Sequence, residues 1–253
     1  MLSRKRPVRS IWMTDLVYKR VMDDLKKKIE SNYFKQNRLP DERTLSAKYH
    51  VSRSSVKQAL SILAEQGIIF KKRGSGTFIN PLYLKNKSIF SYEGSNLGIT
   101  NNLKTEGYDP KIDLLEFKVV SPTAEIAEDL FLNPGDQVYE IKRLRSVDST
   151  PIIIESGYIP VKVAPKMNER VVSGSIFNYL EEKLNKTGTK SYMSIEAQPS
   201  TTEDQRLLGL KPTEPVVIMG GIFFLDDGTP FEISNMRIHY KYFNYNTFVD
   251  LNN

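Results

Sequence analysis

The chain has 253 residues, enough for two domains of ordinary size, and it carries no cysteine and only two histidines. These counts exclude disulfide scaffolds, thiolate chemistry and cysteine-ligated zinc, so we expect neither a cofactor nor a metal. The net charge of +6 is spread unevenly: residues 1–80 hold 18 Lys+Arg and 7 Asp+Glu, whereas residues 81–253 hold 18 Lys+Arg and 23 Asp+Glu. This excess of positive charge predicts that the first third of the chain binds a polyanion.

No segment has the composition of a membrane anchor or a secretory signal. The longest apolar run, Pro215–Leu225, is well short of the roughly 20 residues that a membrane-spanning helix needs. The basic N-terminus has no apolar core behind its cations. We therefore predict a soluble, cytoplasmic protein with no membrane partner.

Two helices are predicted at the start of the chain. Apolar residues recur at steps of three and four over residues 16–29, which is the period of one helical face. Asn32 and Asn37 follow, and asparagine readily adopts the left-handed angles that end a helix. Asp41 then has the chemistry to cap a short second helix that begins at Glu42.

A third helix is predicted between Ser52, which can cap its start, and Gly67, which can end it in a left-handed turn. One apolar stripe is expected to dock on the first two helices, so the polar residues face outward. Two short helices joined by a four-residue turn predict a helix-turn-helix, the alternative being an amphipathic helix of a small bundle. The residues expected to face outward are Arg53, Ser54, Ser55, Lys57, Gln58 and Ser61.

The stretch KKRGSGTFI, Lys71–Ile79, fits a phosphate-binding loop, a plain turn or a contact with nucleic acid. A nucleotide-binding glycine loop needs a helix after it to supply amide donors. Here the flanking segments 68–70 and 77–79 have the composition of strands. The stretch is therefore predicted to be a hairpin with a basic tip, the wing that follows a recognition helix.

The first domain contains three motifs, Leu39-Pro40-x-Glu42-Arg43, Val51-Ser52-Arg53-x-Ser55-Val56-Lys57 and Gly74-Ser75-Gly76-Thr77-Phe78-Ile79. In these motifs the sequence resembles the GntR family of transcriptional regulators. The resemblance implies a winged helix-turn-helix domain over residues 1–80 that binds a double-stranded DNA operator. In the family, the positions that match Arg43, Arg53 and Lys57 contact DNA, and the one that matches Gly76 approaches the minor groove. The candidate DNA-binding residues are Arg43, Ser52, Arg53, Ser54, Ser55, Lys57, Arg73, Gly74, Ser75, Gly76 and Thr77.

Residues 81–88 have little periodicity and are expected to be a linker, followed by a second domain over residues 89–253. This part contains two similar stretches, each predicted to hold a capped helix, a proline turn and two strands. Such a repeat favours an antiparallel sheet with helices on it, an α+β domain with internal pseudosymmetry. The landmarks recur 78 to 79 residues apart: Ser121 with Ser200, Leu132 with Leu210, Pro134 with Pro212, and Thr150-Pro151 with Thr229-Pro230.

One predicted strand, residues 138–145, carries two cations on its apolar face. Arg143 and Arg145 share this face with Tyr139 and Ile141, and buried cations need an anion. Either Glu155 and Glu232 supply it in structural ion pairs, or an anionic ligand does. Gly221, which matches Arg143 in the second repeat, is expected to leave room for such a ligand. Residues 173–175, Ser-Gly-Ser, open a predicted helix whose free amides can also hold an anion.

These residues also resemble the branch of the GntR family named after HutC, whose second domain has a chorismate-lyase-like fold and senses a small molecule. The motifs are Arg143-Leu144-Arg145, Pro151 with Glu155, Tyr158-Ile159-Pro160, Ser175-Ile176-Phe177 and Gly228-x-Pro230-x-Glu232. In members that sense sugar phosphates, the arginines and the serine helix start hold the phosphate, and the last glutamate binds hydroxyls or an amide. The effector-binding candidates are Arg143, Arg145, Glu155, Ser175, Phe177 and Glu232.

The resemblance implies a homodimer that binds a palindromic operator and responds to an anionic metabolite such as a sugar phosphate. A repressor is expected, although the sequence does not fix the sign of regulation. The alternative is a lyase-like enzyme with a DNA-binding head, in which Glu155 and Glu232 act as an acid/base pair. Fold alone does not decide between the two.

Overall fold

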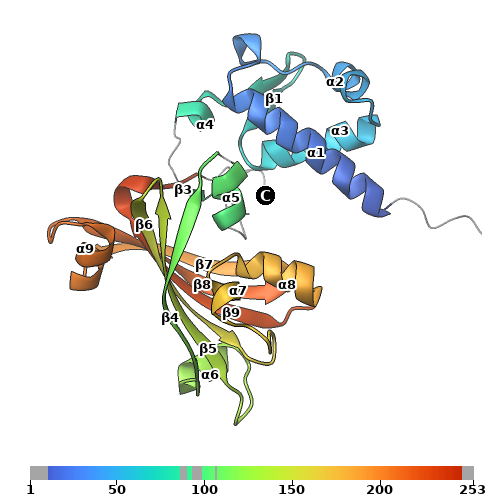
Figure 1. Cartoon of the computed structure of the whole chain (residues 1–253). Helices are drawn as coiled ribbons and strands as arrows, with labels where there is room; N and C mark the ends of the chain where they lie inside the picture. The colour runs from blue at the N-terminus through green and yellow to red at the C-terminus, as the bar shows by residue number, and fades with distance from the viewer. Residues whose placement is uncertain (1–10, 86–89, 93–98, 106, 247–253) are drawn as a thin grey trace, which may run out of the picture. The chain divides into compact units, whose positions relative to one another are not determined.

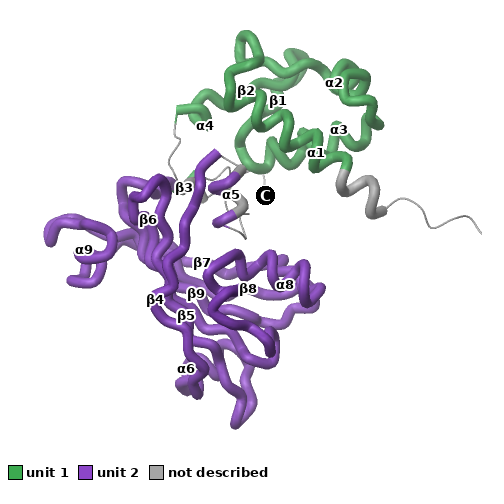
Figure 2. The backbone as a smooth tube through the Cα atoms, in the orientation of Figure 1, with its two compact units in different colours: residues 1–87, 245–253 green, residues 88–244 purple. Residues whose placement is uncertain are grey.

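The computed structural model describes residues 11–85, 90–92, 99–105 and 107–246. The chain divides into two units, residues 1–87 with 245–253 and residues 88–244 (Figure 2). No helix in the described part of the chain is long and apolar enough to cross a membrane.

Unit 1 consists of helices followed by a β-hairpin, in the predicted order (Figure 1). Its predicted wing is an antiparallel pair with register Ile69↔Ile79 to Lys72↔Gly76. Its elements are α1 (Ile11–Glu30), η1 (Lys35–Asn37), α2 (Glu42–Tyr49), α3 (Arg53–Glu65), β1 (Ile69–Lys72), β2 (Gly76–Ile79) and α4 (Pro81–Lys85).

The predicted caps of unit 1 are confirmed. Asp41 Oδ1 accepts a hydrogen bond from Thr44 N at 2.8 Å, and Ser52 Oγ accepts one from Ser55 N at 3.1 Å. These side chains satisfy amide groups that a helix leaves free in its first turn. Gly67 has the left-handed φ of +68° that was expected after α3.

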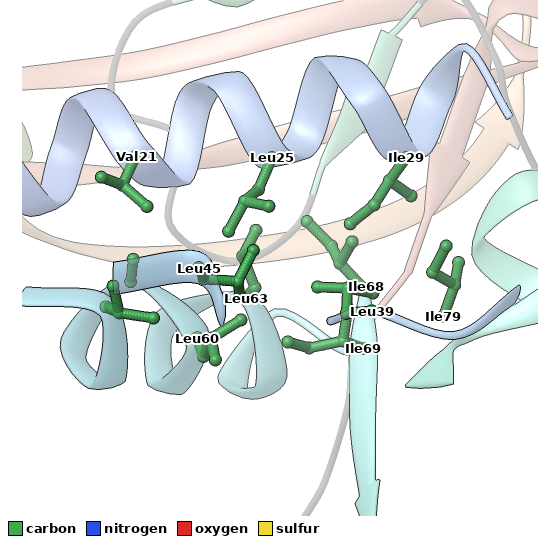
Figure 3. Packing of buried hydrophobic residues seen from close by; sticks show 12 residues of the cluster. Val21, Leu25, Ile29, Leu39, Leu45, Leu60, Leu63, Ile68, Ile69 and Ile79 are labelled. Atoms are coloured by element: carbon green, nitrogen blue, oxygen red, sulfur yellow. The ribbon is translucent and has the colours of Figure 1, made fainter. Parts of the chain in front are cut away.

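The core of unit 1 lies where α1, α2, α3 and the hairpin meet (Figure 3). Leu25 and Ile29 of α1 are fully buried there, together with Leu63 of α3 and Ile69 of β1. Burying such side chains contributes roughly 1.5–3 kcal/mol each. This packing holds α3 by its apolar stripe, so its polar side is left for another partner.

The first five residues of the expected linker, 81–85, are helical and belong to unit 1. Residues 81–85 form helix α4, in which Tyr83 and Leu84 pack against the core of unit 1. The helix begins with Pro81, whose fixed φ suits the first turn of a helix. The side chain of Asn80 accepts a hydrogen bond from Leu82 N at 3.0 Å. Residues 86–88 lie outside the described residues.

Unit 2 is built on a six-stranded antiparallel sheet with strand order β4-β5-β6-β9-β8-β7 (Figure 1). The predicted α+β class is therefore confirmed. The sheet strands are β4 (Pro110–Val120), β5 (Val138–Val147), β6 (Thr150–Pro160), β7 (Gly188–Pro199), β8 (Pro215–Leu225) and β9 (Pro230–His239). The other elements are β3 (Phe90–Tyr92), α5 (Ile99–Thr105), α6 (Ala124–Asp129), α7 (Glu169–Val172), α8 (Ile176–Leu184), α9 (Thr202–Leu208), η2 (Tyr240–Tyr242) and β10 (Phe243–Tyr245).

The predicted internal repeat is also confirmed. Helix α6 precedes the hairpin β5–β6, and helix α9 precedes the hairpin β8–β9, with β6 and β9 paired at the centre of the sheet. Thr123 and Thr201 cap the two helices in the same way. The two halves of the sheet are thus arranged about a pseudo-twofold axis between β6 and β9.

Alternation along the strands sends apolar residues to both faces of the sheet. Tyr139 and Ile141 of β5 pack on the side of α7 and α8, together with Ile176 and Leu180 of α8. Leu144 lies on the opposite side, in the cluster with Leu208 of α9. Arg143 and Arg145 therefore share the face of β5 that is directed toward α7 and α8.

Candidate functional site

The outer side of α3 is polar and exposed, as predicted, with one exception. Arg53, Ser54 and Lys57 are exposed. Ser55 was expected to face outward, but it is 3% exposed and its hydroxyl lies 2.9 Å from Ser52 Oγ. Its position three residues after the cap turns the side chain back toward the cap, so Ser55 supports the helix start and does not present its hydroxyl to a ligand.

A hollow of about 600 Å³ lies between the start of α2 and the hairpin of unit 1. Its two acids are both engaged: Asp41 caps α2, and Glu42 Oε1 lies 3.2 Å from Lys71 Nζ. The hydrogen bond from Thr44 N, followed by further contacts, lowers the pKa of Asp41. The surface of the hollow is thus dominated by cations. Its lining residues include Arg38, Arg43, Lys71, Lys72, Arg73, Gly74, Gly76 and Thr77.

The hairpin turn depends on glycine at two positions. Gly74 has φ +72° and Gly76 has φ +114°. At Gly76 an added Cβ would also lie 3.3 Å from Nε of Arg38, whose guanidinium is 5.8 Å from the centre of the Phe78 ring. Sequence reasoning missed Arg38 as a member of this basic surface. The sequence does contain a feature that points to Arg38, because it is a cation directly before the Leu39-Pro40 motif.

Unit 2 contains a cavity of about 50 Å³ whose lining includes all six residues that were predicted to bind an effector. Arg143 and Arg145 come from β5, Glu155 from β6, and Glu232 from β9. Ser175 and Phe177 lie at the start of α8, where Ser175 Oγ accepts a hydrogen bond from Asn178 N at 3.3 Å. Gly174, which the sequence analysis places at the anion-binding helix start, also lines the cavity. The lining residues that sequence reasoning missed are Ile99, Thr100, Ile176, Met193, Met219, Phe223, Ser234 and Met236.

Glu155 is shared by the two arginines. Its Oε1 accepts a hydrogen bond from Arg145 Nε at 2.6 Å, and its Oε2 lies 2.5 Å from Arg143 Nη2. Burial by itself would raise the pKa of Glu155, but the two guanidinium groups outweigh it and lower the pKa to about 2. At neutral pH the carboxylate is charged, and the three residues together keep one net positive charge.

Both arginines are also tied to the walls of the cavity. Arg143 Nη1 donates to the carbonyls of Val172, at 3.0 Å, and Gly174, at 3.2 Å. Arg145 Nη1 donates to Thr100 Oγ1 at 2.8 Å. Within the described residues, Arg143 Nε is buried and has no hydrogen-bond partner. This N–H group is a donor that a ligand could use.

Glu232 lies in the same cavity but has no comparable partner. It is 8% exposed, and its Oε2 makes no hydrogen bond within the described residues. Burial raises its pKa to about 7, against the attraction of Arg143 and with a small further rise from the charge of Glu155. Of the two acids that were expected to pair with the arginines, Glu155 therefore forms the ion pairs and Glu232 does not.

The expectation that Gly221 leaves room for a ligand is wrong. A Cβ at Gly221 would lie 1.9 Å from the carbonyl oxygen of Tyr192 and 2.8 Å from Met193 Sδ. The missing side chain thus allows β7 to approach β8 closely. The cavity is bounded at this point by Met193.

Comparisons with known proteins agree with this two-part organisation. The family described as "Bacterial regulatory proteins, gntR family" matches residues 17–79, and the UTRA domain family matches residues 105–244. The HTH-type transcriptional regulator GmuR of Bacillus subtilis (strain 168) is 32% identical over 87% of this chain and 92% of its own length. The mannosyl-D-glycerate transport/metabolism system repressor MngR of Escherichia coli (strain K12) is 28% identical over 86% and 89%.

Among solved structures, the possible transcriptional regulator YydK from Bacillus subtilis superposes with a TM-score of 0.75 at 27% identity, over 92% of this chain and 99% of that one. The matches run through both units in the same order. A UTRA domain binds small-molecule effectors, and the cavity in unit 2 lies within the residues matched to it. The chain belongs to the GntR family of transcriptional regulators, in the branch that joins the DNA-binding domain to a UTRA domain.

Proposed function

We propose that this regulator is a homodimeric repressor that holds a palindromic operator until an anionic metabolite enters the cavity of unit 2. The observation that carries the proposal is the sharing of one carboxylate, Glu155, by two buried guanidinium groups. With a pKa of about 7, Glu232 carries only part of a negative charge at neutral pH, so part of the positive charge in the cavity is unneutralised. Such a charge is costly unless an anion joins it. An anionic ligand supplies that charge.

On DNA, the exposed side of α3 would enter the major groove. Arg53 and Lys57 are exposed in its first two turns and can donate to base edges, as can Ser54. Arg43 and Arg73 border the basic hollow and would contact phosphates. The hairpin tip at Gly76 would approach the minor groove. Ser52 and Ser55 are assigned to the start of α3 instead, because their hydroxyls bond each other.

The polar groups of the cavity suit a ligand with an anion at one end and hydrogen-bond donors at the other. Arg143 Nε has no hydrogen-bond partner among the described residues, and the start of α8, at Ser175 and Ile176, lines the same cavity. Glu232 Oε2 is a free acceptor for a hydroxyl group. A sugar phosphate has both features, and the relative MngR is named for a sugar joined to glycerate.

The enzyme alternative requires Glu155 and Glu232 to exchange protons with a substrate. Glu155 is a poor candidate, because its pKa of about 2 and its two arginine partners keep it an anion at neutral pH. Glu232 alone does not make an acid/base pair. We therefore propose sensing without turnover.

A ligand screen tests both proposals. The full chain is melted in the presence of phosphorylated sugars, the same sugars without phosphate, and small carboxylic acids, and each compound is recovered and analysed for conversion. The proposal expects a rise in melting temperature for an anionic compound, release of operator DNA by that compound, and its recovery unchanged. Preference for uncharged sugars would contradict the anion site, and conversion of the compound would favour the enzyme.

A further inference from the structure

Strand β7 forms one edge of the six-stranded sheet and is long and exposed. It spans Gly188–Pro199 and pairs with β8 along one side, while no described strand pairs with its other side. Tyr192 is 74% exposed and Ile195 is 37% exposed. An edge of this kind offers a row of free backbone N–H and C=O groups to another strand.

The opposite edge, β4, is interrupted in the middle of the strand, whereas the irregularity of β7 lies at its first residues. A β-bulge interrupts β4 between Leu114 and Glu116, and Lys118 pairs with Glu116 at 2.6 Å and with Glu140 at 3.2 Å. Bulges and charges are the usual means of blocking edge-to-edge pairing. In β7 the register shifts once, between Gly188 and Lys190, and the pairing with β8 is regular from Lys190 to Pro199.

We propose that β7 pairs antiparallel with β7 of a second copy of this chain, with the twofold axis at Met193. The proposal rests on the homodimer of the proposed function and assigns its interface. The two β7 strands are then related by a twofold axis perpendicular to the sheet, so a side chain and its copy lie on the same face of the joined sheet. Residues that lie opposite one another must therefore have sequence numbers that differ by an even number, which requires the axis to pass through a residue and not between two residues.

Charge complementarity selects Met193 as the axis residue. About this position Lys190 lies opposite the partner's Glu196, and Glu196 opposite the partner's Lys190, which gives two symmetric ion pairs on one face. An axis at the neighbouring Tyr192 or Ser194 would leave Lys190 opposite an uncharged residue. Lys190 and Glu196 are both exposed, and Glu196 Oε1 accepts a hydrogen bond from Gln198 Nε2 at 2.7 Å on the same strand.

The same register brings the exposed apolar residues of the strand together. Tyr192 lies opposite the partner's Ser194 and diagonal to the partner's Tyr192, within reach of an aromatic contact. On the other face, Ile195 lies opposite the partner's Ser191. The interface therefore covers the two large apolar side chains that β7 leaves exposed.

This interface shares a residue with the effector cavity. Met193 lines the cavity and is also the axis residue of the proposed strand pair. A ligand that moves Met193 acts directly on the centre of the dimer. Effector binding and the geometry of the dimer are thereby coupled through one side chain.

Charge reversal tests the register. The dissociation constant of the full chain is measured by analytical ultracentrifugation without DNA or effector. Lys190→Glu and Glu196→Lys should each raise it about tenfold or more, because each places like charges opposite one another twice, and the double variant should restore it. Lys111→Glu, on the β4 edge, is the control and should have no effect.

Cross-linking gives a second measurement that does not depend on charge, because the chain has no cysteine of its own. Cys substituted at Met193 faces its own copy at roughly 4.5–5.5 Å between Cα atoms, which a disulfide can span. Ala197→Cys is the control, because it places the two thiols at opposite ends of the paired β7 strands, too far apart to form a disulfide. The Met193→Cys variant should form a covalent dimer much faster than the Ala197→Cys variant.

Equal cross-linking of the two cysteine variants, or a dimer that is indifferent to both charge reversals, would overturn this interface and leave the homodimer in place. A wild-type chain that remains a monomer at high concentration would overturn the homodimer as well. The two failures are therefore distinguishable.

Discussion

Arg143 lies directly opposite Glu155 in the pairing of β5 with β6, while Arg145 reaches the same carboxylate from the diagonal position. A strand register that aligns two cations with one acid concentrates charge in the interior of unit 2. The consequence is that the fold and the effector cavity depend on the same three side chains.

Removing the shared carboxylate should destabilise unit 2. Glu155→Ala leaves two buried guanidinium groups without a counterion, and breaking a buried pair in this way costs about 3–5 kcal/mol. Chemical denaturation of the purified chain measures the loss. Glu203→Ala is the matched control, since it breaks an ion pair with Lys142 that is substantially exposed and should cost less than about 1 kcal/mol. Equal losses for the two variants would contradict the buried-charge argument.

The stability of unit 2 should also depend on pH through Glu232. Its pKa in the folded chain is raised to about 7 from an ordinary value of 4.5. Between these two values the unfolded chain loses the proton while the folded chain retains it, so the stability contributed by the neutral form falls as pH rises from 4.5 to 7. Above pH 7 the loss is complete.

Glu232→Gln removes this titration. The free energy of unfolding of the variant, measured from pH 4.5 to pH 7, should fall less steeply than that of the wild type. Glu155 affects stability in a different pH range. Because its pKa in the folded chain is lowered to about 2, the stability that its charged form contributes is lost only as pH falls below 4.5. Identical slopes for wild type and variant would show that Glu232 is not buried as a neutral acid.

DNA binding should depend on Arg53 at the start of α3. Arg53→Ala is expected to weaken operator binding by about 1–3 kcal/mol if the side chain reads a base. A mobility-shift titration at fixed salt measures the change. Lys19→Ala removes an exposed positive charge from α1 and should alter affinity much less. An affinity for the operator that is the same in the Arg53→Ala chain as in the wild type would remove this residue from the interface.

Much of this arrangement could be read from the sequence, because local chemistry determines it. Asp41 and Ser52 have side chains that cap a helix, and the two prolines of the repeat, Pro134 and Pro212, mark matching turns in the chain. Alternation along β5 was sufficient to place Arg143 and Arg145 on a buried face. These features depend on residues that are close in sequence.

Other features could not be predicted, because they depend on contacts between distant segments. Thr100 meets Arg145 from a helix 45 residues away, and nothing in its surrounding sequence marks it as a cavity residue. The space beside Gly221 is filled by β7, which pairs with β8 in a register that the sequence does not specify. Ser55 was misassigned because its hydroxyl bonds to the capping serine and not to solvent.

Because Glu155 neutralises only one of the two guanidinium groups, we expect effector binding to depend on Arg143. Arg143→Ala leaves Arg145 paired with Glu155 at 2.6 Å, so the fold keeps its buried ion pair while the cavity loses its net positive charge. The variant should bind operator DNA as the wild type does, yet it should no longer be released by the anionic compound found in the ligand screen. Arg206→Ala, which removes an arginine that is 69% exposed, is the control and should be released normally. An Arg143→Ala chain that the compound still releases from DNA would show that the anion is bound elsewhere.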